Sequence, residues 1–458
     1  MIGSGIFIVS ADITRNVGSA GWIIAVWVIT GIMTITAAVS YGELSGMFPR
    51  AGGQYVYLKE SYNKLIAFLY GWSFFAVIQT ATIAAVAIAF AKFSGYFFPV
   101  LNLTTDNILF SIGSTNFYPA QLVAIGVIVL LTYINSRGIK EGKWIQLVFT
   151  LSKTIALLGL VLFGFLLVDQ SFFAENWATG FNAASDMGGR NELGQRIPSG
   201  WTEITGVALL GAIAAAMVGS VFSSDAWNNV TFVAGEIRNP QRNIGLSLFL
   251  GTLAVTLLYV ITNLMYLNVL PLEGIAFPEE DRLAVAAANE IFGDNGRFAI
   301  AALIMISTFG CNNGLVMAGA RVYYTMAQDG LFFRNAARLN RNGVPQWALW
   351  AQCIVASVLC LSGRYGDLLD MISFVVVIFY VLTIAGIFIL RKRRPEAERP
   401  YKAFGYPFLP ALYILMGLSF CVLLIIYKPA FTWPGLIIVL TGIPIYYIIQ
   451  KGAVRSDS

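Results

Sequence analysis

The chain has 458 residues, of which 57% are hydrophobic and only 12% are charged. A soluble domain carries about 25% charged residues, so this composition excludes a soluble globular protein and indicates a polytopic membrane protein. The chain contains no histidine and has a net charge of only +5. We therefore expect no metal centre, no cofactor and no nucleic-acid partner.

Apolar segments long enough to cross a bilayer recur along the whole chain. A transmembrane helix needs about 20 mostly apolar residues. The sequence predicts an all-α protein with twelve transmembrane helices in a single domain, residues 1–458, in which the first helix is short. The predicted spans cover residues 1–14, 20–48, 64–98, 118–136, 139–168, 204–235, 243–268, 297–328, 345–363, 366–390, 407–427 and 432–450.

Lysine and arginine are distributed unequally between alternate loops. The loops that follow the even-numbered predicted spans carry most of them, and the other loops carry few. Because basic loops remain in the cytoplasm, we expect both termini of the complete protein on the cytoplasmic side of the cell membrane. The basic run Arg391 to Arg394 is predicted to anchor this topology beside anionic lipid.

Two stretches rich in glycine and serine interrupt the apolar pattern. The first is Gly3-Ser4-Gly5, and the second runs from Gly219 to Asp225 inside the sixth predicted span. They begin two halves of five spans each, residues 1–168 and 204–390, which two further helices at about 407–450 follow. Paired interruptions in two halves predict the binding site of a transporter. The alternative is that the first stretch marks a helix-packing contact.

A broken helix offers partners to both ends of an amino acid. The free N–H groups at the start of its second half attract a carboxylate, and the free carbonyls of its first half suit an ammonium group. Glycine allows the ligand to approach the backbone closely, and serine adds a hydroxyl. The pattern therefore favours an amino acid as the small-molecule substrate.

Five sequence blocks point to a known family: MIGSGIF, FPRAGGQYVYLKESY, SDAWNNVTFVAGEIRNPQRNI, GARVYYTMAQDG and LRKRRPEAERPYKAFGYP. In this order, and nearly end to end, they resemble the amino acid–polyamine–organocation superfamily, and within it the L-type amino acid transporters and their bacterial relatives. The resemblance implies the leucine-transporter fold, with two inverted five-helix repeats plus two helices, working by alternating access. It also implies a half-helix before Gly3. We therefore expect the sequence to be truncated or to begin at a wrongly chosen start codon.

The resemblance also assigns roles to residues at the two breaks. The N–H groups of Ser4 and Gly5 would bind the substrate carboxylate, and backbone carbonyls on both breaks would bind its α-amino group. Phe222 matches an aromatic gate that closes over the substrate. The expected substrate-binding residues are Met1, Ile2, Gly3, Ser4, Gly5, Phe222, Ser223, Ser224, Asp225 and Asn228.

Two charged residues stand deep inside predicted spans, where a charge is costly and indicates function. Asp225 could contact a substrate ammonium or cap the second half of the sixth helix. Asn228, one turn later, could reach the substrate or bond between helices. By the resemblance, Lys153 would replace the cation of sodium-driven relatives, reaching the break near Gly3 and the eighth span near Ser307.

These observations predict a sodium-independent amino acid permease or antiporter. Small or neutral substrates are expected, because Ser223 and Ser224 leave the pocket polar. The alternative is a proton-coupled symporter that accepts cationic amino acids, with Lys153 or Asp225 titrating. A sensor that binds substrate without flux is a different class. A membrane enzyme lacks support because no nucleophile–base or metal-binding motif is present.

The cysteines bear on a protein partner. Family members in animals often carry a disulfide-linked heavy subunit, and the loop between the third and fourth predicted spans lacks the cysteine that such a bond needs. All four cysteines lie within apolar spans instead. We expect no disulfide-linked heavy subunit and an independent protein of a bacterial inner membrane, in contact with lipid.

Overall fold

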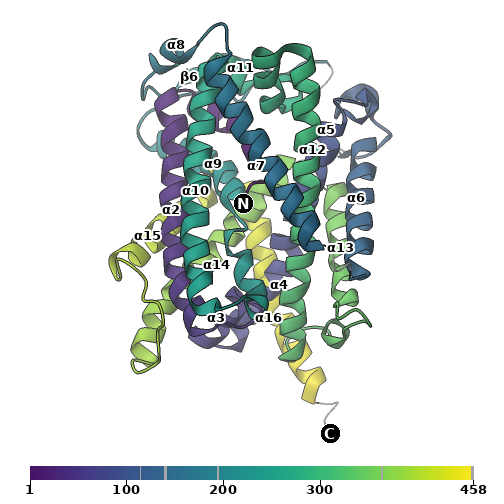
Figure 1. Cartoon of the computed structure of the whole chain (residues 1–458), viewed down its shortest axis with the longest axis vertical. Coiled ribbons are helices and arrows are strands. Elements are labelled where there is room, and N and C mark those ends of the chain that lie inside the picture. The colour runs from purple at the N-terminus through teal and green to yellow at the C-terminus, as the bar shows by residue number, and fades with distance from the viewer. Residues whose placement is uncertain (114, 139–141, 193–194, 363–364, 455–458) are drawn as a thin grey trace.

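A computed structural model describes residues 1–113, 115–138, 142–192, 195–362 and 365–454 as a bundle of long helices (Figure 1). Strands occur only as short pairs in loops. The long helices are α2 (Ala20–Met47), α5 (Gln79–Ser94), α6 (Pro119–Ser136), α7 (Gly142–Leu166), α9 (Gly206–Ser224), α10 (Pro240–Val269), α12 (Leu283–Gln328), α13 (Gln346–Ser362), α14 (Tyr365–Arg393), α15 (Phe408–Tyr427) and α16 (Pro429–Val454).

Shorter elements connect these helices. A π-helical segment, Phe74–Ile78, joins α4 to α5 within one span. The short helices are α1 (Val9–Val17), α3 (Gln54–Ser61), α4 (Lys64–Ser73), α8 (Phe173–Trp177) and α11 (Leu272–Ala276). The strands pair antiparallel as β1 (Phe110–Ile112) with β2 (Thr115–Phe117), β3 (Ala184–Ser185) with β6 (Thr202–Glu203), and β4 (Gly189–Arg190) with β5 (Arg196–Ile197).

The helices confirm a multi-pass membrane protein. Among the described residues, ten helices are long and apolar enough to cross a bilayer, and a shorter apolar helix covers Gln346–Leu361. The helix α1 overlaps the second half of the first predicted span and continues past it to Val17, so a helix lies in every predicted segment. Another boundary differs: the helix predicted from residue 297 already begins at Leu283 and is interrupted at Gly293, where φ is +67°. Glycine accepts this left-handed backbone without steric cost.

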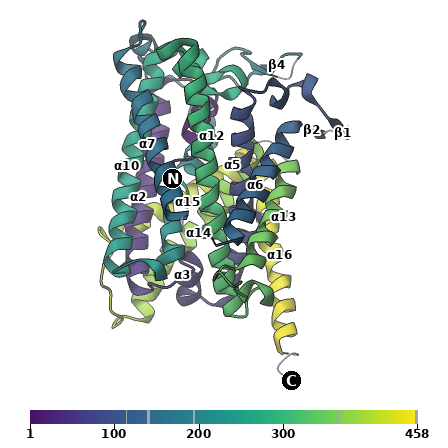
Figure 2. The ribbon, with the colours of Figure 1, turned by 45° about the vertical axis from the view of Figure 1, so that its right-hand side comes forward.

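The loops gather at two ends of the bundle. The loops expected in the cytoplasm lie together at the end that carries α3 and the C-terminus, which we call the basic end (Figure 1). The other end carries α8, α11 and the strand pairs, and we call it the strand end (Figure 2). The chain starts at mid-height between these ends, so its first residues lie inside the bundle, in contact with α9 and α12.

The loop of residues 170–203 contains α8 and two strand pairs, β3 with β6 and β4 with β5. It lies on the turn between α1 and α2, where the N–H of Gly21 donates to the carbonyl of Gly180 at 2.9 Å. The N–H of Asp186 likewise donates to the carbonyl of Arg15 at 2.9 Å. The loop therefore fixes the strand-end terminus of α1, the helix that follows the first break.

Candidate functional site

The first predicted break is present. Residues 1–4 form no helix, a 3-10 turn covers Gly5–Phe7, and α1 begins only at Val9. Ser4 and Gly5 are buried, and within the described chain their N–H groups donate to no backbone or side-chain acceptor. Unpaired N–H groups at the start of a helix attract an anion such as a carboxylate.

The second break lies further along the chain than predicted. The helix α9 continues through Gly219 to Ser224 and ends at Asp225, and Ala226 takes the left-handed region with φ +60°. The chain then continues as a 3-10 helix, Trp227–Glu236. Gly219 serves packing instead, since a Cβ there would lie 2.8 Å from Cβ of Val9 on α1. Of the predicted stretch, Gly219 to Asp225, only its last residue lies at the break, and the prediction is wrong for Gly219 to Ser224, which are helical.

The two broken segments meet beside α10. A Cβ on Gly5 would lie 2.0 Å from Oγ of Ser223, so this glycine also permits close packing against α9. The hydroxyl oxygen of Tyr259 lies 3.1 Å from the carbonyl oxygens of both Met1 and Ser223. A hydroxyl donates only one hydrogen, so one carbonyl from each segment converges on a single donor. Such a pair of carbonyls can also hold an ammonium group.

Lys153 reaches the first break from α7. Its ammonium donates to the carbonyl of Ile2 at 2.6 Å, and the residue is 8% exposed. Ser307 on α12 is buried, and its hydroxyl has no hydrogen-bond partner in the described part of the chain. The structure therefore brings Lys153 to the residue before Gly3 but shows no bond between Lys153 and Ser307.

Two aromatic rings meet beside the first break. The ring of Phe222, in the last turn of α9, meets that of Tyr365 edge to face with centroids 6.0 Å apart. The hydroxyls of Tyr365 and Ser4 are 3.1 Å apart. A cavity of about 570 Å³ at the strand end reaches Tyr365 and, beside it, Val9 and Gly219. Tyr365 was not predicted, because no local pattern distinguishes it among 20 tyrosines.

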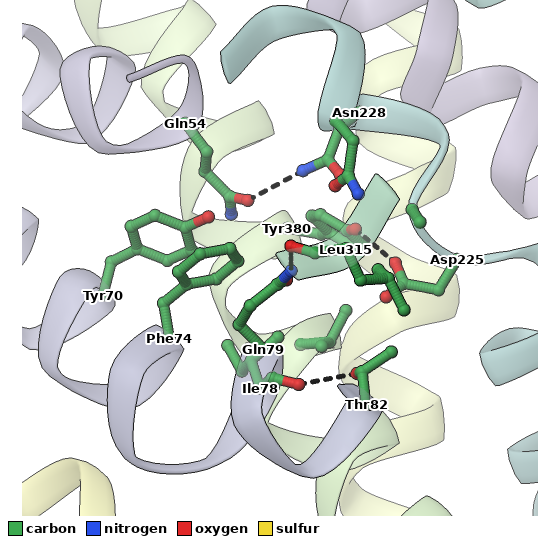
Figure 3. Close-up of a pocket in the computed structure, with 13 residues that line it drawn as sticks. Gln54, Tyr70, Phe74, Ile78, Gln79, Thr82, Asp225, Asn228, Leu315 and Tyr380 are labelled. Carbon is green, nitrogen blue, oxygen red and sulfur yellow. Dashed lines mark hydrogen bonds between the residues drawn. The ribbon is translucent and has the colours of Figure 1, made fainter. Parts of the chain in front are cut away.

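A small polar pocket lies beside the second break (Figure 3). The carboxylate of Asp225 accepts a hydrogen bond from the hydroxyl of Tyr380 on α14 at 2.5 Å. The amide of Asn228 donates to that of Gln54 on α3 at 3.2 Å. The pocket has a volume of about 10 Å³, the space of about one water molecule. The neighbourhood of Asn228 is therefore polar and nearly filled.

The alternative role of Asp225 as a helix N-cap is wrong. Ala226 occupies the N-cap position of the second half, and no side chain caps it. The carboxylate instead points to α14, as Figure 3 shows. Ser224 is buried at the end of α9. Sequence reasoning could not identify Tyr380 as the partner of Asp225, or Gln54 as the partner of Asn228, because the two residues of each pair are far apart in the chain.

The described residues offer no cluster for a metal ion and no disulfide. In the described residues no three His, Cys, Asp or Glu side chains are grouped as a metal site would require. The four cysteines are free, and three of them are buried. What the two breaks assemble is a set of backbone donors and acceptors, which suits binding of a zwitterion.

The chain is similar to known proteins over nearly its whole length. The family model described as "Amino acid permease" matches residues 1–449. The Asc-type amino acid transporter 1 of Mus musculus is 27% identical over 453 residues, which cover 98% of this chain and 78% of the relative. The human large neutral amino acids transporter small subunit 2 is 27% identical over 457 residues, covering 98% and 77%. The human b(0,+)-type amino acid transporter 1 is 25% identical over 460 residues, covering 98% and 84%.

Proposed function

Because the chain belongs to the amino acid permease family, a family of transporters and not of enzymes, we propose that it is a sodium-independent amino acid transporter working by alternating access. The observation that carries this proposal is the meeting of the two breaks. The unpaired N–H groups of Ser4 and Gly5 would bind the substrate carboxylate. The carbonyls of Met1 and Ser223, each 3.1 Å from the hydroxyl of Tyr259, would bind its α-ammonium group.

The remaining predicted site residues would complete the substrate site. Gly3 and Gly5 keep the backbone accessible, and Ser224 and Asn228 lie in or after the last turn of α9. Phe222 and Tyr365 together would form the gate between this site and the strand-end cavity. The carbonyls of Ile2 and Phe222 already accept bonds from Lys153 and from the N–H of Asp225, so we assign them no primary role.

Lys153 supports sodium independence. Its ammonium is bonded at 2.6 Å to the first broken segment, so a fixed positive charge stands where a coupling cation would bridge this segment to α12. A second cation beside it would be repelled. Ser307, buried and without a partner among the described residues, would lie on the α12 side of that place.

The polar character of the site supports a proposal for the preferred substrates, and Asp225 bears on whether transport is exchange or proton symport. We propose exchange of small or neutral amino acids, in accord with the name of one human relative, large neutral amino acids transporter small subunit 2. A second candidate is proton-coupled symport that includes cationic amino acids. Asp225 favours it, because this half-buried carboxylate is bonded to the neutral hydroxyl of Tyr380 and has no ion-pair partner in the described part of the chain.

The cellular setting is proposed on the same basis. One relative is named a small subunit, but we propose that this chain works without a disulfide-linked heavy subunit, because its cysteines lie within membrane helices. Its place would be the cell membrane, with the basic end in the cytoplasm. The division into inverted repeats, residues 1–168 and 204–390, stays a prediction.

Uptake into proteoliposomes tests the function. Radiolabelled alanine, leucine and lysine are offered in sodium-free buffer, with and without internal amino acid and with and without a pH gradient. Uptake that requires internal amino acid and ignores the pH gradient supports exchange. Uptake into empty vesicles that follows the pH gradient replaces exchange by proton symport. Binding without flux under every condition overturns the transporter proposal in favour of a sensor.

A further inference from the structure

The connection between α5 and α6, residues 95–118, differs in charge from the other large loop at the strand end. It contains a single charged residue, Asp106, and no lysine or arginine. The loop of residues 170–203 is longer and has six charged residues: Glu175, Asp186, Arg190, Glu192, Arg196 and Glu203. Charged side chains favour water, so the two loops are suited to different surroundings.

The polar side chains of this connection are used inside the protein. The amide of Asn107 donates to the carbonyls of Pro99 and Asn102 at 2.9 and 3.1 Å. The side-chain oxygen of Asn102 accepts a bond from the guanidinium of Arg282. Asn116 accepts a bond from the hydroxyl of Ser111 at 2.8 Å and lines the strand-end cavity. These bonds give the connection a defined shape, in which Asn116 faces the cavity.

Its apolar side chains are exposed. The strands β1 and β2 pair Phe110 with Phe117, whose rings are stacked with centroids 4.6 Å apart. Side chains alternate along a strand, so Phe110 and Ile112 share one face and Ser111 occupies the other. The exposed apolar residues of the connection are Phe97 at 36%, Phe98 at 62%, Val100 at 58%, Leu109 at 51%, Phe110 at 54% and Ile112 at 66%. A water-exposed loop has the opposite arrangement.

The exposed face continues the lipid-facing surface of the bundle. β1 and β2 project sideways beside α5 and α6 (Figure 2). Phe97 and Phe98 of the same connection line an apolar groove of about 500 Å³ together with Phe149 on α7 and Phe309 on α12. Both of these helices contain membrane spans, and the span of α7 is only 28% buried in the protein. The groove therefore belongs to the surface that lipid covers.

We propose that the strand pair β1–β2 and the exposed apolar residues before it, Phe98, Val100 and Leu109, are immersed in the membrane leaflet at the strand end. The apolar face would lie among the lipid headgroups and upper acyl chains, where aromatic side chains are favoured. The polar face, with Asn116, forms one wall of the strand-end cavity. Lipid thereby contacts the element that lines the cavity, and this inference does not depend on which substrate is transported.

Spin-label accessibility tests this placement in the full chain, reconstituted into phosphatidylcholine bilayers. A nitroxide is attached to Ile112→Cys and, separately, to Phe110→Cys. Matched controls are Ser111→Cys, on the other face of the same strand, and Glu192→Cys, in the charged loop. Unsubstituted protein reports labelling of the native cysteines. Collisions with oxygen, which concentrates in lipid, are compared with collisions with a water-soluble nickel chelate.

The proposal expects labels at 110 and 112 to collide mainly with oxygen, with an oxygen-to-nickel ratio several-fold above that at 111 and 192. Nickel access at 110 and 112 equal to that at 192 would place the strands in water and overturn it. Protection from both reagents would mean that protein, a second copy or another chain, covers the face, and would also overturn it. If either variant fails to fold, Val100→Cys carries the same comparison.

Discussion

The hydrogen bond from Lys153 to the carbonyl of Ile2 joins the membrane-spanning helix α7 to the first break. We expect Lys153→Met to lower amino acid uptake at least about tenfold, because it removes a charged bond that contributes about 1.5–3 kcal/mol and leaves the carbonyl of Ile2 without its donor. Initial uptake rates in proteoliposomes measure the effect. Lys92→Met is the control, since Lys92 is also a span lysine but pairs with Asp281 at the strand end. Wild-type uptake by Lys153→Met would contradict the assigned role.

Glu43 illustrates a charge whose function is structural. It is 1% exposed and accepts two bonds from the guanidinium of Arg391, at 3.0 and 2.7 Å, and one from the N–H of Ala403 at 2.7 Å. The run from Arg391 was predicted to face anionic lipid, and the structure gives both Arg391 and Arg394 carboxylate partners within the protein. Glu43 thus ties α2 to the connection between α14 and α15.

Removing that charge should destabilise the protein. We expect Glu43→Gln to cost about 3–5 kcal/mol, because it leaves the buried guanidinium of Arg399, 3.4 Å from Glu43, and the part-buried guanidinium of Arg391 without their counter-charge. Glu60→Gln is the control: its partner Arg394 has a side chain 49% exposed, so the loss should be about 0–1 kcal/mol. Thermal unfolding in detergent, followed by size-exclusion chromatography, compares the two. Equal midpoints for both variants would show that Glu43 is not a buried anchor.

At the level of elements, the membrane helices were predictable because each requires a long apolar segment. The first break was also predictable, since two glycines around a serine oppose a regular helix. The second was misplaced by several residues because glycine has two uses: Gly219 looks like a break but allows Val9 to approach. Tyr365, the proposed partner of Phe222 in a gate, could not be predicted, since its contact with Ser4 joins residues 361 positions apart.

The packing of the two broken segments gives a prediction of its own. Gly5→Ala should reduce uptake at least about tenfold, because its Cβ would lie 2.0 Å from Oγ of Ser223, and overpacking typically costs about 1–3 kcal/mol. Adding Ser223→Gly removes the clashing atoms and should restore part of the activity. Gly251→Ala on α10 is the control, because a Cβ there meets nothing within 4 Å. Uptake assays on the four proteins check this, and an inactive double variant would show that Ser223 itself is required.

On the scale of the whole molecule, an ion-pair cluster joins distant helices at the strand end. The carboxylate of Asp281 lies 2.9 Å from the guanidinium of Arg15 on α1 and 3.5 Å from the ammonium of Lys92 on α5. Burial alone would raise the pKa of the Asp281 carboxyl, but the charges of Lys92 and Arg15 outweigh it and hold this pKa well below its usual value. The Asp281 carboxyl is therefore ionised at every physiological pH.

This depressed pKa fixes the direction of the pH dependence. The stabilisation by Asp281 is fully present above its unfolded pKa of about 3.9 and is lost only as the pH falls toward the lower folded value. Asp281→Asn should cost about 1–3 kcal/mol at pH 7, and the difference from wild type should persist to pH 5 and narrow below pH 4. Unfolding midpoints of both proteins at each pH measure it. A difference that vanishes between pH 7 and pH 5 would contradict the assignment.

The whole bundle is open on one side of the breaks and closed on the other. The cavity of about 570 Å³ at the strand end stops at Tyr365, whereas the pocket beside Asp225 has room for about one water molecule. Two positions on α5 report on this difference: Ile88 lines the cavity, and Thr82 lines the pocket. A membrane-impermeant thiol reagent should therefore modify Ile88→Cys at least about tenfold faster than Thr82→Cys, with unsubstituted protein as the baseline.

Removing the Tyr365 ring should change only the slower of the two modification rates, the one at Thr82→Cys. In a Tyr365→Ala background the reagent should reach Thr82→Cys faster, while Ile88→Cys, already above the gate, should react as before. Equal rates at the two positions before the gate is removed would mean that the protein in the membrane does not adopt this arrangement. An unchanged rate at Thr82→Cys after its removal would mean that Tyr365 does not close the path. Alternating access requires the opposite pattern, with Thr82→Cys the more reactive, when the basic end opens.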